Sequence, residues 1–371
     1  MHTIVSGVHL FDTCTNRCSY CHFAETGKVI DHSQIAPYRD PKFIDRLLYF
    51  FLDGVGSKYH WELVLTGGEP LLMPNLDRFV TGLVSKDNLV SFNTALNISG
   101  TNENYLFLQN LDPTKVGHIF ASLHPDSDQD EDNFFYRVKL LKDSGHAIMV
   151  RFVCHPARLN RLEELEEKCR RIDVAFSPSA MISPSYPQGY SAYQRQLIEN
   201  HLTSVGQLIQ LRGGLDTKVT KCHAGSHLLG MDFRTGNISI CSTIPDNIIG
   251  NIFDNIMTIK TTPITCPKAG NISCNCNLYV QKNIIIGVDD SKNFMEQKLG
   301  YVPPKRVDDL QRSLVAPNRI ELINMNMGQV ETSSSLILSP SFVRDAYERN
   351  KGYLHGNYRK EFHQEFTSRI H

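Results

Sequence analysis

The chain has 371 residues, of which 41% are hydrophobic and 21% are charged, so a large apolar core is available and wholesale disorder is excluded. Its 38 Lys and Arg residues nearly balance its 39 Asp and Glu residues, which leaves no basic surplus for nucleic-acid binding. No run of about 18 apolar residues occurs, so we expect neither nucleic acid nor a membrane as a partner.

The ten cysteines are the unusual feature of the composition. Residues 1–11 lack the charged region, apolar stretch and cleavage site of a signal peptide, so we expect a cytoplasmic protein. In that compartment, cysteines indicate metal ligands or reduced thiols rather than disulfides. At about 150 residues per domain, the length predicts two domains, or one barrel-sized domain with an appendage.

Strand-like and helical segments alternate along the first 211 residues. The predicted strands are Ile4–Phe11, Trp61–Thr66, Leu89–Thr94, His118–Leu123, Ala147–Val153 and Val174–Ser177. The predicted helices are Pro41–Leu52, Leu76–Ser85, Glu103–Asn110, Asn133–Asp143, Leu162–Arg171 and Tyr193–Leu211. This alternation predicts an α/β fold with a parallel sheet. Six units, rather than the eight of a closed barrel, predict an open (β/α)6 barrel.

Side-chain parity gives the later strands one apolar face and one more polar face. The polar face of the third strand carries Asn93, that of the fourth Ser122 and His124, and that of the fifth Arg151 and His155. A barrel filled only with hydrophobic side chains needs no polar inner face, whereas a barrel that holds a polar ligand does. The alternative is that these are short or irregular strands whose polar residues face water.

Cys14, Cys18 and Cys21 form a C-x3-C-x2-C motif in the loop after the first predicted strand. Three thiolates at this spacing can bind three irons of a 4Fe–4S cluster and leave the fourth iron open for another ligand. A zinc site is the alternative, although structural zinc prefers four ligands, usually in two separated pairs.

With the aromatic Tyr20 before its last cysteine, this motif resembles the signature of the radical S-adenosylmethionine (SAM) superfamily. The second strand ends in Thr66-Gly67-Gly68-Glu69-Pro70, which is similar to the Gly-Gly-Glu motif of that superfamily. The resemblance implies a partial (β/α)6 TIM-like barrel over residues 1–212. It also implies an enzyme that reductively cleaves SAM to a 5′-deoxyadenosyl radical, which abstracts a hydrogen atom from its substrate. An electron donor such as flavodoxin or ferredoxin would reduce the cluster.

The resemblance implies roles for the residues of the two motifs. The three cysteines would hold the 4Fe–4S cluster, and the amino and carboxylate groups of SAM would chelate its free iron. Gly67 and Gly68 would let the backbone approach the cofactor closely. The Glu69 segment would meet the amino group of SAM, and Tyr20 would flank the adenine.

Four further residues are candidates by their inward positions on later strands. Asn93, Ser122 and Arg151 would contact the ribose and carboxylate of SAM, with ordinary hydrogen bonding inside the barrel as the alternative. His124 is a catalytic candidate for acid–base chemistry or substrate binding, because it lies at the carboxyl end of a strand. A histidine satisfied by ordinary hydrogen bonds is the alternative for His124.

A second cysteine-rich stretch, residues 213–284, resembles the SPASM/Twitch extension that carries auxiliary iron–sulfur clusters in this superfamily. A β-hairpin predicted around Gly236 would bring Cys222 near Cys241. Five cysteines are too few for two clusters, so one auxiliary 4Fe–4S cluster is expected, with one cysteine to spare. A zinc site or buried thiols are the alternatives. The candidate ligands are Cys222, Cys241, Cys266, Cys274 and Cys276.

The resemblance implies a reaction class rather than a substrate or an outcome. A single auxiliary cluster and a chain that begins almost at the first strand favour a small polar substrate, such as a sugar or nucleoside. The auxiliary cluster would assist its oxidation or anchor it. Modification of a ribosomal peptide or protein side chain is the alternative. A non-catalytic electron-transfer protein is another, although an electron carrier needs no cofactor cavity. Residues 285–371 carry no motif and form a C-terminal extension without an assigned role.

Overall fold

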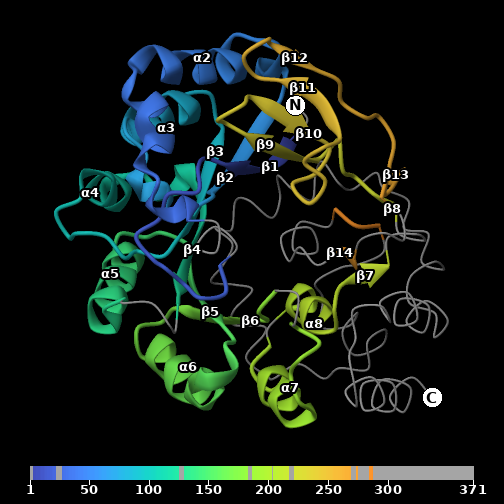
Figure 1. The fold of residues 1–371 in the computed structure, drawn as a ribbon. Helices are drawn as coiled ribbons and strands as arrows, with labels where there is room; N and C mark the ends of the chain where they lie inside the picture. Colours follow the sequence, from blue (N-terminus) through green and yellow to red (C-terminus); the bar gives the residue numbers. More distant parts are fainter. Residues whose placement is uncertain are drawn as a thin grey trace.

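The computed structural model describes residues 3–21, 27–124, 129–182, 186–202, 204–216, 221–268, 273–274 and 284–286. Six parallel strands form the centre of the fold, each hydrogen-bonded to the next in chain order (Figure 1). They are β1 (Thr3–His9), β2 (His60–Thr66), β3 (Leu89–Thr94), β4 (Val116–Leu123), β5 (Ile148–Val153) and β6 (Ala175–Ser179). The predicted parallel α/β barrel sheet is therefore confirmed.

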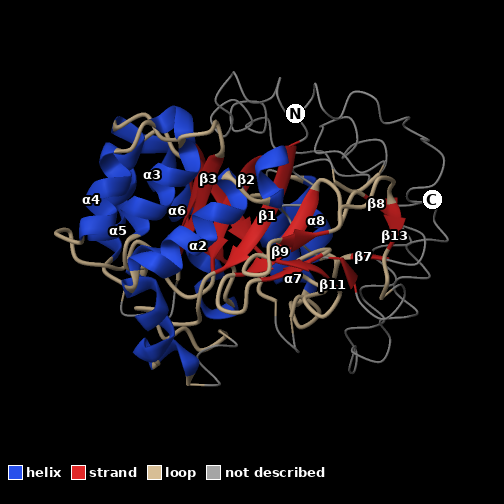
Figure 2. Cartoon of the chain, turned by 90° about the horizontal axis from the view of Figure 1, so that it is seen from above, coloured by secondary structure: helices blue, strands red, loops and turns tan. Residues whose placement is uncertain are grey.

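The helices pack on the outer side of this sheet (Figures 1 and 2). The buried residues of α3 recur at helical spacing, which makes one face apolar for packing on the strands. The α-helices are α2 (Pro41–Leu52), α3 (Leu76–Val84), α4 (Glu103–Asn110), α5 (Glu131–Asp143), α6 (Leu162–Arg171), α7 (Ala192–Glu199) and α8 (Val205–Leu211). The 3-10 helices are η1 (Lys28–Ile30), η2 (His32–Arg39), η3 (Val55–Lys58), η4 (Pro70–Leu72), η5 (Pro113–Lys115) and η6 (Pro156–Arg161).

The prediction of one continuous helix over Tyr193–Leu211 is wrong, because the structure has two helices there, α7 and α8. The break is a new helix start at Ser204, whose side chain accepts from the Gln207 N–H at 3.2 Å. The Gln207 side chain in turn accepts from the Ser204 N–H at 2.9 Å. This reciprocal capping box satisfies two free donors of the first turn, so it stabilises a helix start within an otherwise helical pattern.

The central sheet continues beyond β1 into the second cysteine-rich stretch. Strand β9 (Leu228–Asp232) pairs in parallel with β1, and β10 (Asn237–Ser239) pairs antiparallel with β9. Gly236, with φ +74°, lies in the turn between them, so the predicted hairpin is confirmed. The remaining strands are β11 (Ile248–Asn251) and β12 (Ile256–Met257) at the edge of this sheet, and the short pairs β8 (Lys221–Cys222) with β13 (Ile264–Thr265) and β7 (Leu215–Asp216) with β14 (Ser273–Cys274).

The inside of the barrel is distinct from the main apolar core. Phe120, Met149 and Ala175 form a small buried cluster of their own, and Phe120 and Met149 share strand parity with the predicted polar faces of the fourth and fifth strands. No helix in the described ranges is long and apolar enough to cross a membrane. Cys276 and nearly all of the C-terminal extension, residues 287–371, lie outside the described residues.

Candidate functional site

The loop after β1 carries the three N-terminal cysteines and is held by backbone hydrogen bonds. The Cys14 N–H donates to Val29 O at 3.0 Å, and the Cys21 N–H donates to Cys18 O at 3.0 Å. The Asn16 N–H donates to Cys14 Sγ at 3.4 Å. The local turn therefore already directs a hydrogen-bond donor at one of the sulfur atoms.

The electrostatics of Cys14 show which groups surround it. Burial raises the pKa of Cys14 to about 11, and the charges of Glu69 and, more weakly, Cys21 add to the shift. Binding of an iron cation to such a thiol would displace its proton. The cysteine motif and the Gly-Gly-Glu segment, 48 residues apart between Cys21 and Glu69, therefore lie close together.

Two glycines allow the Gly-Gly-Glu segment to lie against the backbone of the cysteine loop. The Gly68 N–H donates to Phe11 O at 2.6 Å, and the Glu69 N–H donates to Thr13 O at 2.9 Å. A Cβ atom at Gly67, whose φ is +129°, would overlap Phe11 O, and one at Gly68 would overlap Thr13 O. The close approach in the structure is thus to the loop backbone, and the approach of these glycines to the cofactor stays a prediction.

The Glu69 carboxylate is fully buried and accepts three hydrogen bonds from the protein. Oε1 accepts from the Leu71 N–H at 3.1 Å and from the Thr94 hydroxyl at 2.7 Å, and Oε2 accepts from the Ala95 N–H at 2.8 Å. Burial raises the pKa of Glu69, and the three hydrogen bonds oppose that shift. An ionised carboxylate has about four acceptor positions, so one position is left for a further donor.

Replacing Glu69 with Gln should therefore affect both stability and cofactor binding. In either orientation, the Gln amide would point its NH2 at a backbone N–H that now donates to the carboxylate. We expect the free energy of unfolding to fall by about 1–3 kcal/mol. If Glu69 binds the amino group of SAM, as the Gly-Gly-Glu resemblance implies, SAM binding should also weaken by about ten- to a hundredfold through loss of a charge-assisted hydrogen bond. Urea unfolding and equilibrium SAM binding measure the two effects. Glu103→Gln, at an exposed position in α4, is the control. Wild-type stability and wild-type SAM affinity in Glu69→Gln would contradict a role of Glu69 in the fold and in SAM binding.

Tyr20, His124 and His155 are brought together from three parts of the sequence. The Tyr20 hydroxyl lies 2.7 Å from His124 Nδ1. The centroid of the Tyr20 ring is 6.2 Å from each of the two histidine rings. His124 directly follows β4, and its backbone N–H donates to Gln129 Oε1 at 2.9 Å. The catalytic candidate His124 therefore contacts and orients the aromatic residue of the cysteine motif.

The three inward candidates on the later strands are neighbours in the sheet. Ser122 lies beside Arg151 in the register of β4 and β5, and Asn93 lies beside Phe120 in that of β3 and β4. The Arg151 guanidinium carbon is 4.2 Å from the centroid of the Phe120 ring, a cation–π contact. The three candidates thus lie on adjacent strands, with Asn93 beside the Phe120 ring that Arg151 contacts.

Two buried polar atoms near these elements fit a bound polar ligand. Asn93 Oδ1 and Asn16 Nδ2 are buried and have no hydrogen-bond partner among the described residues. Asn97 Nδ2 donates to Asn16 Oδ1 and so orients the amide within the cysteine loop. Buried polar groups without partners are rare in native proteins. An acceptor on β3 and a donor in the cysteine loop are therefore suited to groups of a cofactor.

A polar network at the opposite end of the barrel was missed by the sequence reasoning. The Ser91 hydroxyl donates to Glu62 Oε1 at 3.0 Å and lies 3.1 Å from His118 Nδ1. All three residues are buried and lie in the amino-terminal halves of their strands. Ser91, Glu62 and His118 therefore bind one another at this end of the barrel. A glutamate within the hydrophobic second strand was the available signal.

A second missed network joins the cysteine loop to the hairpin of β9 and β10. Asp12, which is 2% exposed, contacts His9 Nε2 at 2.8 Å and accepts from Arg234 Nη1 at 3.1 Å. Arg234 also binds Asp232 at 2.8 Å. Burial, with a smaller effect of Arg234, lowers the pKa of His9. The start of the cysteine loop is therefore anchored by a residue more than 200 positions away.

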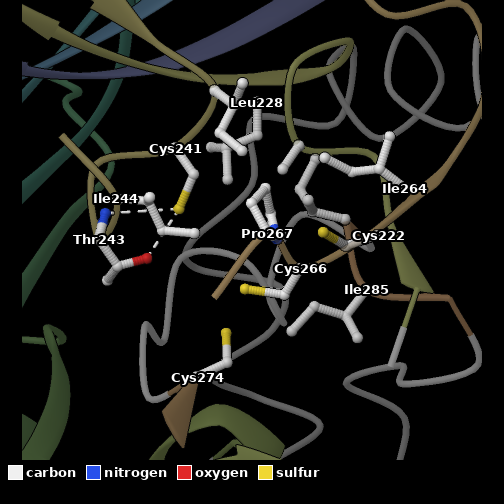
Figure 3. Close-up of a pocket in the computed structure, with 13 residues that line it drawn as sticks. Cys222, Leu228, Cys241, Thr243, Ile244, Ile264, Cys266, Pro267, Cys274 and Ile285 are labelled. Carbon is white, nitrogen blue, oxygen red and sulfur yellow. Dashed lines mark hydrogen bonds between the residues drawn. The ribbon is translucent and has the colours of Figure 1, made fainter. Parts of the chain in front are cut away.

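Four cysteines of the second stretch line one cavity. Figure 3 shows their sulfur atoms distributed around it. Nearly all the other lining side chains are apolar. In the described part of the chain, no group of three His, Cys, Asp or Glu side chains is arranged to hold a single metal ion. The four are Cys222, Cys241, Cys266 and Cys274.

Two of these cysteines accept hydrogen bonds from the backbone two residues ahead. The Thr243 N–H donates to Cys241 Sγ at 3.4 Å, and the Ala224 N–H donates to the Cys222 sulfur. Burial raises the pKa of Cys222 to about 11, although this hydrogen bond opposes the shift. Donors directed at sulfur stabilise thiolate ligands of iron–sulfur clusters. The local geometry at both cysteines, as in the N-terminal loop, is therefore suited to cluster binding.

No family model and no curated protein matches this chain. Among solved structures, anSMEcpe with bound AdoMet matches with a TM-score of 0.52 and 11% identity over 99% of this chain and 96% of that chain. The structure titled anSMEcpe with bound AdoMet and Cp18Cys peptide matches with a TM-score of 0.50 and 11% identity over the same shares, 99% and 96%. Streptococcus suis SuiB matches with a TM-score of 0.46 and 16% identity. The match covers 66% of this chain and 61% of the SuiB chain. The chain therefore has the fold of the radical SAM enzymes, as its cysteine and Gly-Gly-Glu motifs predict.

Proposed function

We propose that this chain is a radical SAM enzyme that binds a 4Fe–4S cluster through Cys14, Cys18 and Cys21. The observation that carries the proposal is the contact between the cysteine loop and the Gly-Gly-Glu segment, in which the Glu69 N–H donates to Thr13 O at 2.9 Å. It brings three thiols and a buried carboxylate to the carboxyl ends of β1 and β2, where barrel enzymes carry their chemistry.

When bound, the cluster and SAM supply the electron transfer and bond cleavage that yield the 5′-deoxyadenosyl radical. The residues of the chain bind and orient these groups. The remaining acceptor position of Glu69 receives the ammonium of SAM, and the orphaned Asn93 Oδ1 accepts a hydrogen bond from the cofactor. Ser122 and Arg151 bind its ribose and carboxylate. Tyr20, oriented by His124, flanks its adenine.

This function is tested by anaerobic reconstitution of the full chain with iron and sulfide. The reduced protein should convert SAM to methionine and 5′-deoxyadenosine, which chromatography detects. A reduced protein that holds its clusters and forms no 5′-deoxyadenosine would instead support the non-catalytic electron-transfer alternative.

We also propose one auxiliary 4Fe–4S cluster bound by Cys222, Cys241, Cys266 and Cys274. Support comes from the shared cavity of the four sulfur atoms (Figure 3) and from the backbone donors directed at two of them. Four thiolates complete the ligand set of such a cluster. Cys276 is then the surplus cysteine.

Replacing Cys222 and Cys241 with Ala should separate the two clusters by function. The first cluster would supply the electron for SAM cleavage, so we expect SAM cleavage without substrate to persist while product formation is lost. Iron should fall from about eight to about four atoms per chain. Cys276→Ala is the matched control and should keep all of the iron. Because a bound cluster also stabilises its fold, size-exclusion chromatography must accompany the assays. A folded double variant that forms product at the wild-type rate would contradict a catalytic role of the auxiliary cluster.

Two substrate classes are proposed, and each has its own support. A single auxiliary cluster favours a small polar molecule, as the cysteine count predicts. A peptide or protein side chain is favoured by similarity, over nearly the whole chain, to a structure titled as holding a Cp18Cys peptide. Deuterated cell extract, divided into small molecules and polypeptides, distinguishes them. The fraction that transfers deuterium into 5′-deoxyadenosine contains the substrate.

A further inference from the structure

Thr243 places its backbone N–H and its hydroxyl against one of the cysteines in the auxiliary cavity. Its backbone N–H donates to Cys241 Sγ at 3.4 Å, and its hydroxyl oxygen lies 2.7 Å from the same sulfur. Figure 3 shows both contacts at the edge of the cavity. Cys241 is 5% exposed, so water competes little for this sulfur.

The direction of the hydroxyl contact follows from the chemistry of a ligand. Between a thiol and a hydroxyl, either group can donate. A cysteine bound to iron is a thiolate with no proton, so the Thr243 hydroxyl must then donate to Cys241 Sγ. Cys222 accepts only the backbone part of this pattern from its own turn, because Ala224 has no hydroxyl. The hydroxyl therefore distinguishes the position of Cys241 from that of Cys222.

The surroundings increase the effect of this donor. The cavity wall is otherwise apolar, with residues such as Leu228, Ile240 and Ile244 around the sulfur atoms. In such a medium a hydrogen bond is electrostatically stronger than in water. One-electron reduction adds negative charge to a cluster, and hydrogen bonds to its sulfur ligands are among the factors that set its potential. A donor at Cys241 thus favours the reduced form.

We propose that Thr243 raises the reduction potential of the auxiliary cluster through the hydrogen bond from its hydroxyl to Cys241 Sγ. This inference rests on the auxiliary cluster proposed above. Thr243 is a positioning residue in this role, since it acts on the cluster through a ligand and not on the substrate. Its effect would make the cluster a better electron acceptor.

The test is a redox titration of the reconstituted full chain, followed by electron paramagnetic resonance with and without SAM. SAM perturbs only the signal of the first cluster, which identifies the auxiliary signal. Thr243→Val removes the hydroxyl and keeps the shape and the backbone N–H. We expect the equilibrium constant for one-electron reduction to fall about tenfold, which is a shift of about 59 mV to more negative potential. Thr243→Ser keeps a hydroxyl and should keep the wild-type potential.

The possible outcomes separate this proposal from the one on which it rests. A wild-type chain with about four irons, whose only cluster signal responds to SAM, would refute the auxiliary cluster and the role of Thr243 with it. Two clusters and an unchanged auxiliary potential in Thr243→Val would refute the role of Thr243 alone. Loss of the auxiliary cluster from both Thr243→Val and Thr243→Ala would also refute it, because the hydroxyl would then be needed for binding rather than for the potential.

Discussion

Replacing Cys14, Cys18 and Cys21 together with Ala is expected to abolish SAM cleavage completely. The three thiols are the proposed ligands of the cluster that passes an electron to SAM, and no other described cysteine lies in the loop after β1. Iron should fall by about half, from about eight to about four atoms per chain. The proposed auxiliary site uses different ligands and should keep its cluster. Iron analysis and chromatography of 5′-deoxyadenosine measure the two effects.

The control for this variant is Cys169→Ala. Cys169 is also a thiol, but it is fully buried in the apolar core on α6, where it packs as a small hydrophobic residue. The Cys169→Ala protein should keep the wild-type iron content and rate of SAM cleavage, with at most a modest loss of stability. SAM cleavage by the triple variant would show that the cluster responsible is bound elsewhere in the chain.

The elements of the barrel were predictable because their signals are local. Three of the predicted helices, Pro41–Leu52, Glu103–Asn110 and Leu162–Arg171, have the predicted bounds, since helical periodicity and flanking residues suffice to define them. The cysteine motif is local as well, because three thiols within eight residues must share one loop. The break at Ser204 had a local signal too, in the Ser-x-x-Gln spacing of a capping box.

The contacts that complete the site join residues far apart in the sequence, and no sequence pattern predicts them. Strand β9 pairs with β1 across more than 200 residues, and no periodicity shows which strand will lie at that edge. The ion pair of Asp12 with Arg234 follows from this pairing. Likewise, the three donors to Glu69 come from η4 and from the end of β3. Only the fold shows that the motif carboxylate is already engaged by the protein.

Gly68→Ala, in the Gly-Gly-Glu segment, is expected to disrupt another contact between distant parts of the sequence. A Cβ atom at residue 68 would overlap Thr13 O and lie 2.6 Å from Asp12 O. Both neighbours are backbone atoms, so no side-chain rotation can relieve the overlap. The cysteine loop must move away, which breaks the hydrogen bond from the Gly68 N–H to Phe11 O. We expect loss of the first cluster and of SAM cleavage, with a fall of about 1–3 kcal/mol or more in the free energy of unfolding.

Gly100→Ala is the matched control, because a Cβ atom at Gly100 would meet no atom within 4 Å and its φ is not in the left-handed region. This variant changes the same residue type in the same way, but in open space between β3 and α4. It should keep the wild-type iron content and rate of SAM cleavage. Iron analysis and urea unfolding on both variants therefore separate the effect of close approach from that of reduced backbone freedom. A Gly68→Ala protein with full iron and normal SAM cleavage would mean that the Gly-Gly-Glu segment does not lie in close contact with the cysteine loop. The assignment of Glu69 to the cofactor site would then lose its geometric basis, because the same contact brings the carboxylate to the cysteines.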